Sequence, residues 1–307
     1  MPLKTIAYFG PRGTFTEQAA RSLATDQELV PADTIAGALA AVRAGDADAA
    51  CVPVENSVEG PVNATLDGLA IGTPLVAVAE ALLPVHFSIL TRPGIREAAD
   101  IRTVASHPHA LAQVRQWLAD TLPDAQTVAA SSTAAAAVSV QRGECDAAVT
   151  APVAVEHYPL PILATGVADV LDARTRFLLV QTPGPLPRPT GADRTSVLAS
   201  TANRPGALAE LLTELAFRGI NLTRLDARPA RGNFGEYRFF LDFEGHLAEQ
   251  RVGDAVAALH RRCSSVRFLG SHPRADRVAD TVAPAAANDD YTNAAEWVAA
   301  VRAGETA

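Results

Sequence analysis

Residues 52–60 read Val-Pro-Val-Glu-Asn-Ser-Val-Glu-Gly and mark the end of a predicted buried strand. The apolar run over residues 49–54 predicts a strand covered on both faces, and it stops at Glu55, Asn56 and Ser57. A helical pattern begins near Asn63. Polar side chains between the carboxyl end of a strand and a following helix lie where open α/β sheets bind their ligands. An ordinary solvated loop has the same composition, so the rest of the chain must decide between the two interpretations.

The composition describes a globular protein with neither a nucleic-acid nor a membrane partner. The chain has 307 residues, more than one domain usually has, and 48% of them are hydrophobic. A net charge of -8 argues against the basic surface that nucleic acids need, and no apolar run has the length of a membrane span. Cys51, Cys145 and Cys263 lie far apart without metal-ligand spacing. Because no signal-peptide pattern precedes the first strand, we expect a cytoplasmic protein with reduced thiols and no metal site.

A proline-rich stretch at residues 181–191 divides the chain. We expect a two-lobed domain over residues 1–182, a linker over 183–192 and a compact domain over 193–271. The remaining residues, 272–307, are expected to form a tail with one short helix over 294–302, anchored by Trp297.

A weak internal repeat predicts that the first domain has two similar lobes. Residues 35–50 match residues 133–148 in register, with Gly45 opposite Gly143 and Asp48 opposite Asp146. Each copy reads as an alanine-rich helix, a glycine stop and an apolar strand. Two such α/β lobes facing each other across a cleft resemble the periplasmic binding-protein architecture.

The second domain shows the pattern of a ferredoxin-like βαββαβ unit. The expected elements are a helix that stops at Gly219, a hairpin pair, a second helix and a last strand. In the second strand of the hairpin, aromatic and aliphatic residues alternate with charged ones, as in a half-buried strand. The predicted strands cover residues 195–201, 222–229, 236–244 and 265–269, and the predicted helices cover 205–218 and 248–261.

Three further segments of the first domain place polar groups at strand ends. Gly10-Pro-Arg12-Gly13-Thr14 ends in a Thr-x-x-Glu capping box, where free amides and Arg12 suit a carboxylate. Ser106-His107-Pro-His109 ends another strand, and either histidine is a candidate general acid. Arg176 opens a strand near residue 174 and suits bidentate pairing with a carboxylate. An ordinary turn, a solvated histidine and a surface charge are the competing interpretations.

Taken together, these motifs resemble prephenate dehydratase followed by an ACT domain. The resemblance covers residues 6–270, and the Glu-Asn-Ser and Thr-Arg-Phe motifs in one chain are highly specific. The motifs are Gly10-Pro-x-Gly13-Thr14, Glu55-Asn56-Ser57-x-x-Gly60, Thr65-Leu66-Asp67, Ser106-His107-Pro108, Thr175-Arg176-Phe177, Gly206-Ala207-Leu208 and Arg228-Pro229.

The resemblance implies the conversion of prephenate to phenylpyruvate, with loss of water and carbon dioxide, in phenylalanine biosynthesis. It implies no cofactor. Thr175 is the catalytic residue by resemblance. The expected substrate-binding residues are Thr14, Asn56, Ser57, Ser106, Arg176 and Phe177.

Two residues compete for the chemical role. A threonine hydroxyl is a very weak acid, so we expect Thr175 to donate a hydrogen bond to the leaving hydroxyl rather than a full proton. Glu55 is the rival, because a carboxyl group in a closed cleft could act as a general acid.

For the ACT domain, the resemblance implies phenylalanine as feedback effector and at least a homodimer, either a dimer or a tetramer. The expected effector-binding residues are Gly206, Ala207, Leu208, Asn221 and Leu222. One departure concerns the effector: Asp226-Ala227 replaces the Glu-Ser usual in this family.

Other functions fit parts of the pattern. A non-catalytic two-lobed carboxylate sensor would share the fold, but it would not need Thr175-Arg176-Phe177. Arogenate dehydratase would carry out the same reaction on an analogue of prephenate. An ACT-regulated enzyme with other chemistry is disfavoured by the N-terminal motifs, and a fused mutase by the strand that begins at Thr5.

Overall fold

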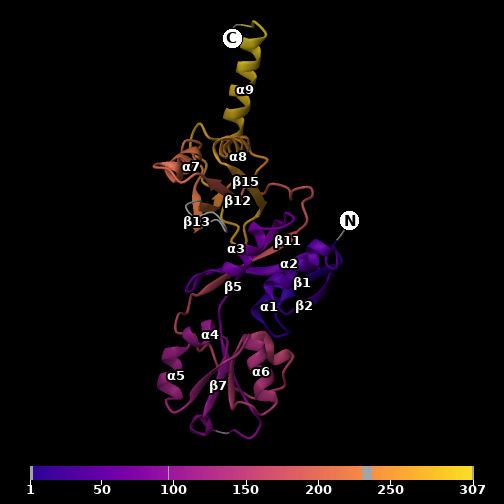
Figure 1. The fold of residues 1–307 in the computed structure, drawn as a ribbon, viewed down its shortest axis with the longest axis vertical. Helices are drawn as coiled ribbons and strands as arrows, with labels where there is room; N and C mark the ends of the chain where they lie inside the picture. The colour runs from indigo at the N-terminus through magenta and orange to yellow at the C-terminus, as the bar shows by residue number, and fades with distance from the viewer. Residues whose placement is uncertain (1–2, 96, 230–236, 306–307) are drawn as a thin grey trace. The chain divides into compact units, whose positions relative to one another are not determined.

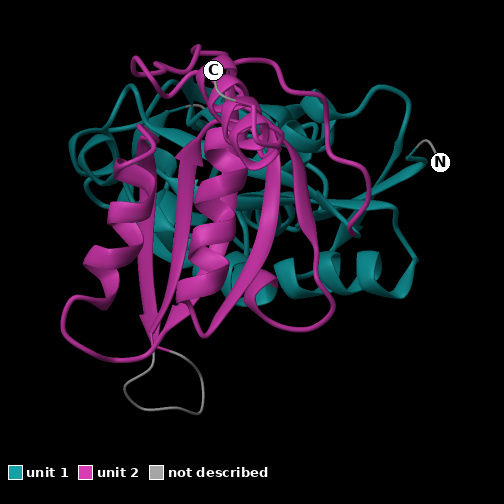
Figure 2. Cartoon of the chain, turned by 90° about the horizontal axis from the view of Figure 1, so that it is seen from above, with its two compact units in different colours: residues 1–68, 81–182 teal, residues 69–80, 183–307 magenta. Residues whose placement is uncertain are grey.

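The computed structural model describes residues 3–95, 97–229 and 237–305. The chain forms two compact units (Figure 2): unit 1 comprises residues 1–68 and 81–182, and unit 2 comprises 69–80 and 183–307. Segment 69–80 joins unit 2 through its own contacts. Ala77 pairs with Gly270, and the buried Glu80 carboxylate accepts a 2.5 Å hydrogen bond from Arg194. Residue 236, predicted to open a strand, lies outside the described residues. No helix in the described ranges is long and apolar enough to cross a membrane.

The first lobe of unit 1 is an α/β sheet with strand order β2-β1-β3-β11. The first three strands run parallel, and β11 lies antiparallel to β3. A short strand, β4 (Gly60–Pro61), folds back on the end of β3, and helix α3 (Asn63–Ala70) follows. The main elements are β1 (Thr5–Phe9), α1 (Phe15–Leu23), β2 (Glu28–Ala32), α2 (Ile35–Ala44), β3 (Ala49–Asn56) and β11 (Arg174–Gln181).

The second lobe has strand order β10-β6-β9-β7-β8. In Figure 1 its strand β7 is drawn between the helices labelled α5 and α6. Strand β7 runs parallel to β8 and β9, and β6 lies antiparallel to β9. Strand β5 (Val76–Pro84) leads into this lobe. Its elements are β6 (Ser88–Thr91), β7 (Thr103–Ser106), α4 (Pro108–Ala112), α5 (Arg115–Thr121), β8 (Gln126–Ala129), α6 (Thr133–Gln141), β9 (Ala147–Thr150), a 3-10 turn (Pro152–Glu156) and β10 (Ile162–Thr165).

The two lobes confirm the internal repeat down to single hydrogen bonds. The Asp48 carboxylate accepts the backbone N–H and the hydroxyl of Thr5, at the start of β1. The Asp146 carboxylate accepts the same two groups from Thr103, at the start of β7. Each aspartate therefore joins the beginnings of two neighbouring parallel strands, β1 and β3 in the first lobe and β7 and β9 in the second. Both sheets bury apolar strands under alanine-rich helices, and the fully buried residues include Ile6, Leu39, Val52, Val104, Ala136 and Val149.

Unit 2 contains the predicted βαββαβ domain, with strand order β13-β14-β12-β15. Two helices cover one face and bury Val197, Leu215, Leu241, Phe243 and Leu259 against the strands. The elements are β12 (Asp193–Thr201), α7 (Ala207–Ala216), β13 (Leu222–Pro229), β14 (Tyr237–Glu244), α8 (Gln250–Arg262), β15 (Ser265–Pro273) and α9 (Asn288–Arg302).

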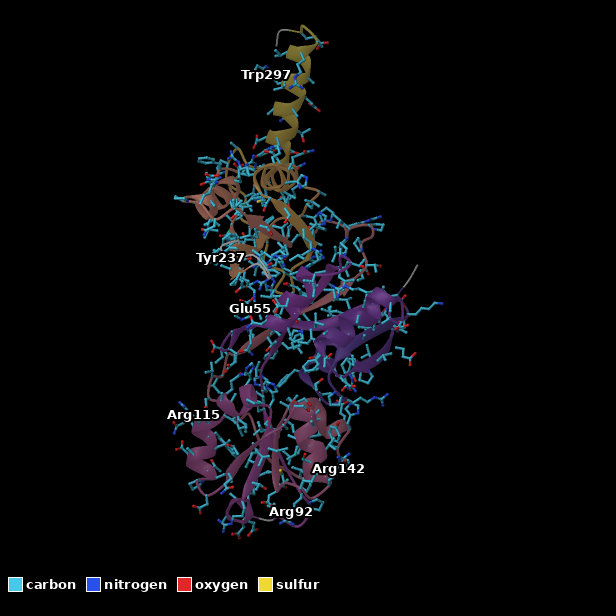
Figure 3. The ribbon with its side chains drawn as sticks, viewed as in Figure 1. Glu55, Arg92, Arg115, Arg142, Tyr237 and Trp297 are labelled. Carbon is cyan, nitrogen blue, oxygen red and sulfur yellow. The ribbon has the colours of Figure 1, made fainter. Side chains whose placement is uncertain are left out.

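The tail differs from its prediction in two respects. Strand β15 continues to Pro273, because Ser271 and His272 are fully buried polar residues inside the domain. Helix α9 begins at Asn288, six residues before the expected start. The prediction that Trp297 anchors this helix is wrong for the single chain, since the residue is 56% exposed (Figure 3).

Candidate active site and effector site

The pairing of β3 with β11 brings the two most specific motifs together. In this antiparallel register, Thr175 lies opposite Asn56 and Arg176 lies opposite Glu55. The register shifts between Arg176 and Phe177, and this bulge separates the tip of the strand pair from the regular ladder that follows it. Segments that are 119 positions apart in sequence therefore form one polar cluster at the end of β3.

Asn56 fixes the orientation of the Thr175 hydroxyl. Its side-chain oxygen accepts the backbone N–H groups of Val58 and Glu59, at 2.8 and 3.0 Å. The amide nitrogen must therefore face the other way, where it donates to Thr175 Oγ1 at 2.9 Å. A hydroxyl that accepts from Asn56 keeps its own hydrogen for another acceptor. The cluster thus presents one oriented donor at a partly buried position.

Arg176 and Glu55 form an ion pair at the adjacent register position of the same strand pair. Arg176 Nη2 lies 3.4 Å from Glu55 Oε2. The arginine side chain is only 8% exposed, whereas the glutamate, labelled in Figure 3, is 40% exposed. A buried cation needs an anion nearby. Glu55 supplies that anion from a position open to solvent, which is not the closed surrounding that a carboxyl general acid would need.

Ser57 and Phe177 hold the strand tip together. The Ser57 hydroxyl accepts the backbone N–H of Arg174 at 2.9 Å, and the Ser57 N–H donates to the carbonyl of the same residue at 2.9 Å. Phe177 is 1% exposed and belongs to the core. Thr65, in α3, donates to the Pro53 carbonyl at 2.5 Å and ties the helix to β3.

The loop after β1 uses its capping groups differently from the prediction. The Thr14 hydroxyl caps α1 by accepting the N–H of Glu17 at 3.3 Å. The predicted capping box would return the Glu17 carboxylate to the N–H of Thr14. Instead, the carboxylate accepts the N–H of Gly13 at 2.5 Å. That amide is therefore occupied internally and is not available to a ligand in this conformation.

Glu17 also connects the two lobes, through residues that no sequence motif singles out. Its buried carboxylate lies 2.7 Å from Arg21 and 3.0 Å from His157 Nε2, just after the 3-10 turn of the second lobe. The Tyr158 hydroxyl donates to the Arg12 carbonyl at 2.8 Å. No local pattern marks these two ring residues, because their partners lie about 140 positions earlier.

The strand end at Ser106 is closed rather than open. The Ser106 side chain is 0% exposed, and its hydroxyl donates to the Val149 carbonyl at 2.7 Å. His107 caps α4 by accepting the N–H of His109 at Nδ1. Burial, with a smaller contribution from His109, lowers the pKa of His107. Because this favours the neutral imidazole, His107 is poorly suited to donate a proton at neutral pH.

Comparison with known proteins assigns this arrangement to a family. The sequence model described as prephenate dehydratase matches residues 6–185, and that described as ACT domain matches 195–261. The chain belongs to the prephenate dehydratase family.

A prephenate dehydratase of Amycolatopsis methanolica is 72% identical over 307 residues, which cover 99% of this chain and 100% of the relative. A crystal structure of prephenate dehydratase from Arthrobacter aurescens, in complex with L-Phe, is 44% identical. It has a TM-score of 0.92 and covers 97% of this chain and 99% of its own. GqqA, described as a novel type of quorum quenching acylase, is 32% identical with a TM-score of 0.79, covering 88% and 98%.

The ACT domain of this prephenate dehydratase family member separates its predicted effector residues into two places. Gly206, at φ +80°, precedes α7 next to the end of β12, where Thr201 pairs with Tyr237. Asn221 and Leu222 lie at the other end of the sheet, where Leu222 pairs with Phe243. Six strand positions separate Tyr237 from Phe243, a distance of roughly 20 Å. One domain therefore cannot bring both groups to one small ligand.

Neighbouring residues complete the description of these two places. Ala207 and Leu208, the other predicted effector residues, form the first turn of α7 and are partly buried. An ion pair joins the segment before α7 to the helix itself, with Arg204 Nη1 and Nη2 at 2.6 and 2.5 Å from the Glu210 carboxylate. On β13, Asp226 accepts a 2.6 Å hydrogen bond from Arg224. The shorter acid at position 226 is thus engaged within its own domain.

Proposed function

We propose that Thr175 donates the hydrogen bond that lets the ring hydroxyl of prephenate leave. The overall reaction releases the ring carboxylate as carbon dioxide and the hydroxyl, with one proton, as water, and it leaves phenylpyruvate. The electron pair of the breaking carbon–carbon bond makes the ring aromatic. The enzyme must therefore stabilise charge on the departing oxygen and hold two carboxylates in place.

The Asn56–Thr175 hydrogen bond of 2.9 Å is the observation that carries this proposal. It orients the hydroxyl as a donor before the substrate arrives, so little reorganisation is needed when charge develops on the leaving oxygen. Removing one such preorganised donor typically costs about 10²–10³ in kcat. The chemistry of Thr175 as a positioned donor therefore needs no unusual acidity of the hydroxyl.

Arg176 is the proposed carboxylate partner, and Glu55 is its counter-ion in the free enzyme. A substrate carboxylate would replace the Glu55 carboxylate and accept two hydrogen bonds from the buried guanidinium of Arg176. Glu55→Gln separates this role from that of general acid. A counter-ion variant keeps most of its kcat, whereas loss of a general acid lowers kcat by about 10²–10⁴.

The other predicted substrate residues support the site in this proposal. Thr14, Ser57 and Ser106 each use a side-chain oxygen in a bond to the protein backbone, and Phe177 packs in the core. We propose that they set the shape of the loops that receive prephenate.

We also propose that phenylalanine regulates the enzyme by binding between ACT domains of two chains, in a homodimer or homotetramer in the cytoplasm. Two observations support this: the related Arthrobacter protein was solved in complex with L-Phe, and Gly206 and Asn221 lie at opposite ends of one sheet. In a second copy turned by a two-fold axis, Asn221 of one domain can approach Gly206 of the other. Saturating phenylalanine should then change both activity and sedimentation, and Asn221→Ala should weaken both responses.

The direct test measures phenylpyruvate formation from prephenate and phenylalanine formation from arogenate, for the wild type, Thr175→Ala and Thr175→Ser. Rapid turnover of prephenate that falls by about 10²–10³ in Thr175→Ala and largely survives in Thr175→Ser supports the proposal. Turnover of arogenate but not of prephenate would make arogenate the substrate. Full kcat in Thr175→Ala would refute the role of the hydroxyl.

A further inference from the structure

The segment between β15 and α9, residues 274–287, lies against the turn that leads to Asn221; we call this segment the strap. A Cβ added at Gly219 would lie 3.2 Å from Ala286 Cβ and 3.3 Å from Ala283 Cβ. The Ala286 N–H donates to the Ala283 carbonyl at 3.0 Å, so a tight bend of the strap brings both methyl groups to Gly219. Ala286 is only 6% exposed. The strap is therefore so close to the turn that only glycine fits at position 219 without moving its neighbours.

A buried arginine connects the turn to the strap from the other side. Arg251, in α8, is 1% exposed, and its Nη1 donates to the Gly219 carbonyl at 3.3 Å. Its Nη2 lies 4.0 Å from Oδ2 of Asp280, a strap residue whose side chain is 4% exposed. The other oxygen of this carboxylate lies 3.8 Å from Arg274 Nη1. Because opposite charges attract more strongly away from water, Asp280 holds the Arg251 guanidinium at the carbonyl of the turn.

Both ends of the strap are fixed to the domain. At its beginning, the Arg274 N–H donates to the Ala192 carbonyl at 2.8 Å. Directly after its last residue, Asn288 Oδ1 accepts the N–H of Gln250 at 2.8 Å, at the start of α8. The strap is thus a fixed surface against which the turn can be held.

The turn determines where Asn221 lies. Gly219 ends α7 at φ +62°, and Ile220 is 5% exposed and packs in the core of the domain. The Asn221 carbonyl accepts the N–H of Glu244 at 3.0 Å, whereas the residue itself is exposed. Only one buried residue separates Gly219 from Asn221, so a displacement of the first is passed on to the second.

We propose that the strap is a positioning element of the effector site, which holds the turn of residues 219–221 through Asp280 and Ala286. The inference rests on the effector site proposed above, in which Asn221 of one chain approaches Gly206 of another. The strap residues act through the turn and need not touch phenylalanine. Their substitution should therefore change the affinity for phenylalanine and leave the turnover of prephenate without effector unchanged.

Two matched pairs of variants of the full chain test this role. Asp280→Asn removes the buried charge, and Asp289→Asn removes the same charge from an exposed position in α9. Ala286→Val enlarges the side chain that faces the turn, and Ala279→Val makes the same change at an exposed position of the strap. Burial raises the pKa of Asp280 to about 6, so measurements at about pH 8 keep its carboxylate charged.

Isothermal titration calorimetry with phenylalanine measures the Kd of each variant. Asp280→Asn and Ala286→Val should each raise the Kd roughly three- to thirtyfold. The two control variants should stay within about twofold of the wild type. The kcat and KM for prephenate without phenylalanine should match the wild type in all four variants. A loss of thermal stability with an unchanged Kd would make the strap a cover for the core and would overturn the proposal.

Amide hydrogen exchange at residues 219–222 gives a readout that needs no effector. In the free protein, exchange there should be faster in Asp280→Asn and Ala286→Val than in their controls, because the turn opens more often when the strap holds it less firmly. Exchange rates that are the same in all variants would contradict the proposal even if the Kd values differ. A wild type that binds no phenylalanine would instead refute the effector site itself and, with it, this role of the strap.

Discussion

The two lobes of unit 1 share one framework and differ at the end of a single strand. Both have a parallel trio of strands, an antiparallel neighbour and an aspartate that joins two strand beginnings. Strand β9 stops two residues after Ala148, whereas β3 continues six residues after the matching Ala50. Strand β11 pairs with seven positions of β3, but β6 pairs with only four of β9. The candidate active site is this extension, so in the proposed function the shared framework supplies stability and the extra residues supply the chemistry.

The largest expected effect separates the extension from the framework. Arg176→Gln removes a buried guanidinium from the proposed carboxylate contact and should lower kcat/KM by about 10²–10³, mainly through KM. Arg174→Gln, two residues earlier on the same strand, changes an exposed arginine and should lower kcat/KM less than threefold. Steady-state kinetics with prephenate distinguishes them. Similar losses in both variants would mean that the strand tip recognises charge only in a general way.

Gly13→Ala tests whether the lobes depend on their contact at the first loop. Gly13 has φ +93°, and an added Cβ would lie 2.8 Å from the Tyr158 ring and 3.2 Å from Ala154 Cα. Thermal unfolding should show a loss of about 2–4 kcal/mol. The matched positions Gly45 and Gly143 also have positive φ but meet nothing within 4 Å. Their alanine variants should each lose only about 1 kcal/mol and resemble one another. If Gly13→Ala lost no more stability than these two variants, the contact between the lobes would not contribute to stability.

The paired aspartates give a smaller, purely structural comparison. Asp146→Ala leaves two backbone amides without an acceptor and breaks an ion pair with Arg92, which is labelled in Figure 3, so it should cost about 1–3 kcal/mol. Asp48→Ala should cost less, because Asp48 is exposed and, in the described part of the chain, accepts its hydrogen bonds from Lys4 and Thr5 rather than from an arginine. Denaturant unfolding at pH 7 measures both, and a larger loss in Asp48→Ala would contradict the comparison.

The same two aspartates predict a pH dependence. Backbone N–H groups at the start of β1 lower the pKa of Asp48 below its ordinary 3.8. For Asp146, burial raises the pKa, but hydrogen bonds from Arg102, Arg92 and Thr103 together lower it. A carboxylate with a depressed folded pKa stabilises the protein above its unfolded pKa and loses this contribution as pH falls through the folded pKa. The free energy by which the wild type is more stable than each alanine variant should therefore decrease below about pH 4.

Hydrophobic periodicity and the residues that end helices and strands predicted most of the framework. Alanine-rich helices, Gly45 and Gly143 as stops and the alternation over 237–244 identified both lobes and the βαββαβ domain, because each depends on neighbours in sequence. The β3–β11 register could not be predicted in this way, since pairing across 119 positions depends on the whole sheet. The resemblance alone linked those motifs. Glu17 shows the limit of local rules: its carboxylate bonds Gly13 and His157 instead of closing the expected box.

The tail shows the opposite limit. Its alanine- and proline-rich composition indicated the end of a domain, yet the Asp280 N–H donates to the Gly191 carbonyl, and Asn288 Oδ1 accepts the N–H of Gln250 at the start of α8. Small residues explain part of this packing, since Ala283 and Ala286 lie against Gly219. Composition alone does not reveal such a fit, because it depends on the shape of the surface beneath.

A double-mutant cycle between Asn56 and Thr175 tests the central claim most directly. If Asn56 acts by orienting the Thr175 hydroxyl, Asn56→Ala should lower kcat for prephenate, but by less than Thr175→Ala does. The double variant should then be no slower than Thr175→Ala alone, because the orienting group has nothing left to orient. Losses that multiply fully in the double variant would show that the two side chains act independently and would contradict this account of the site.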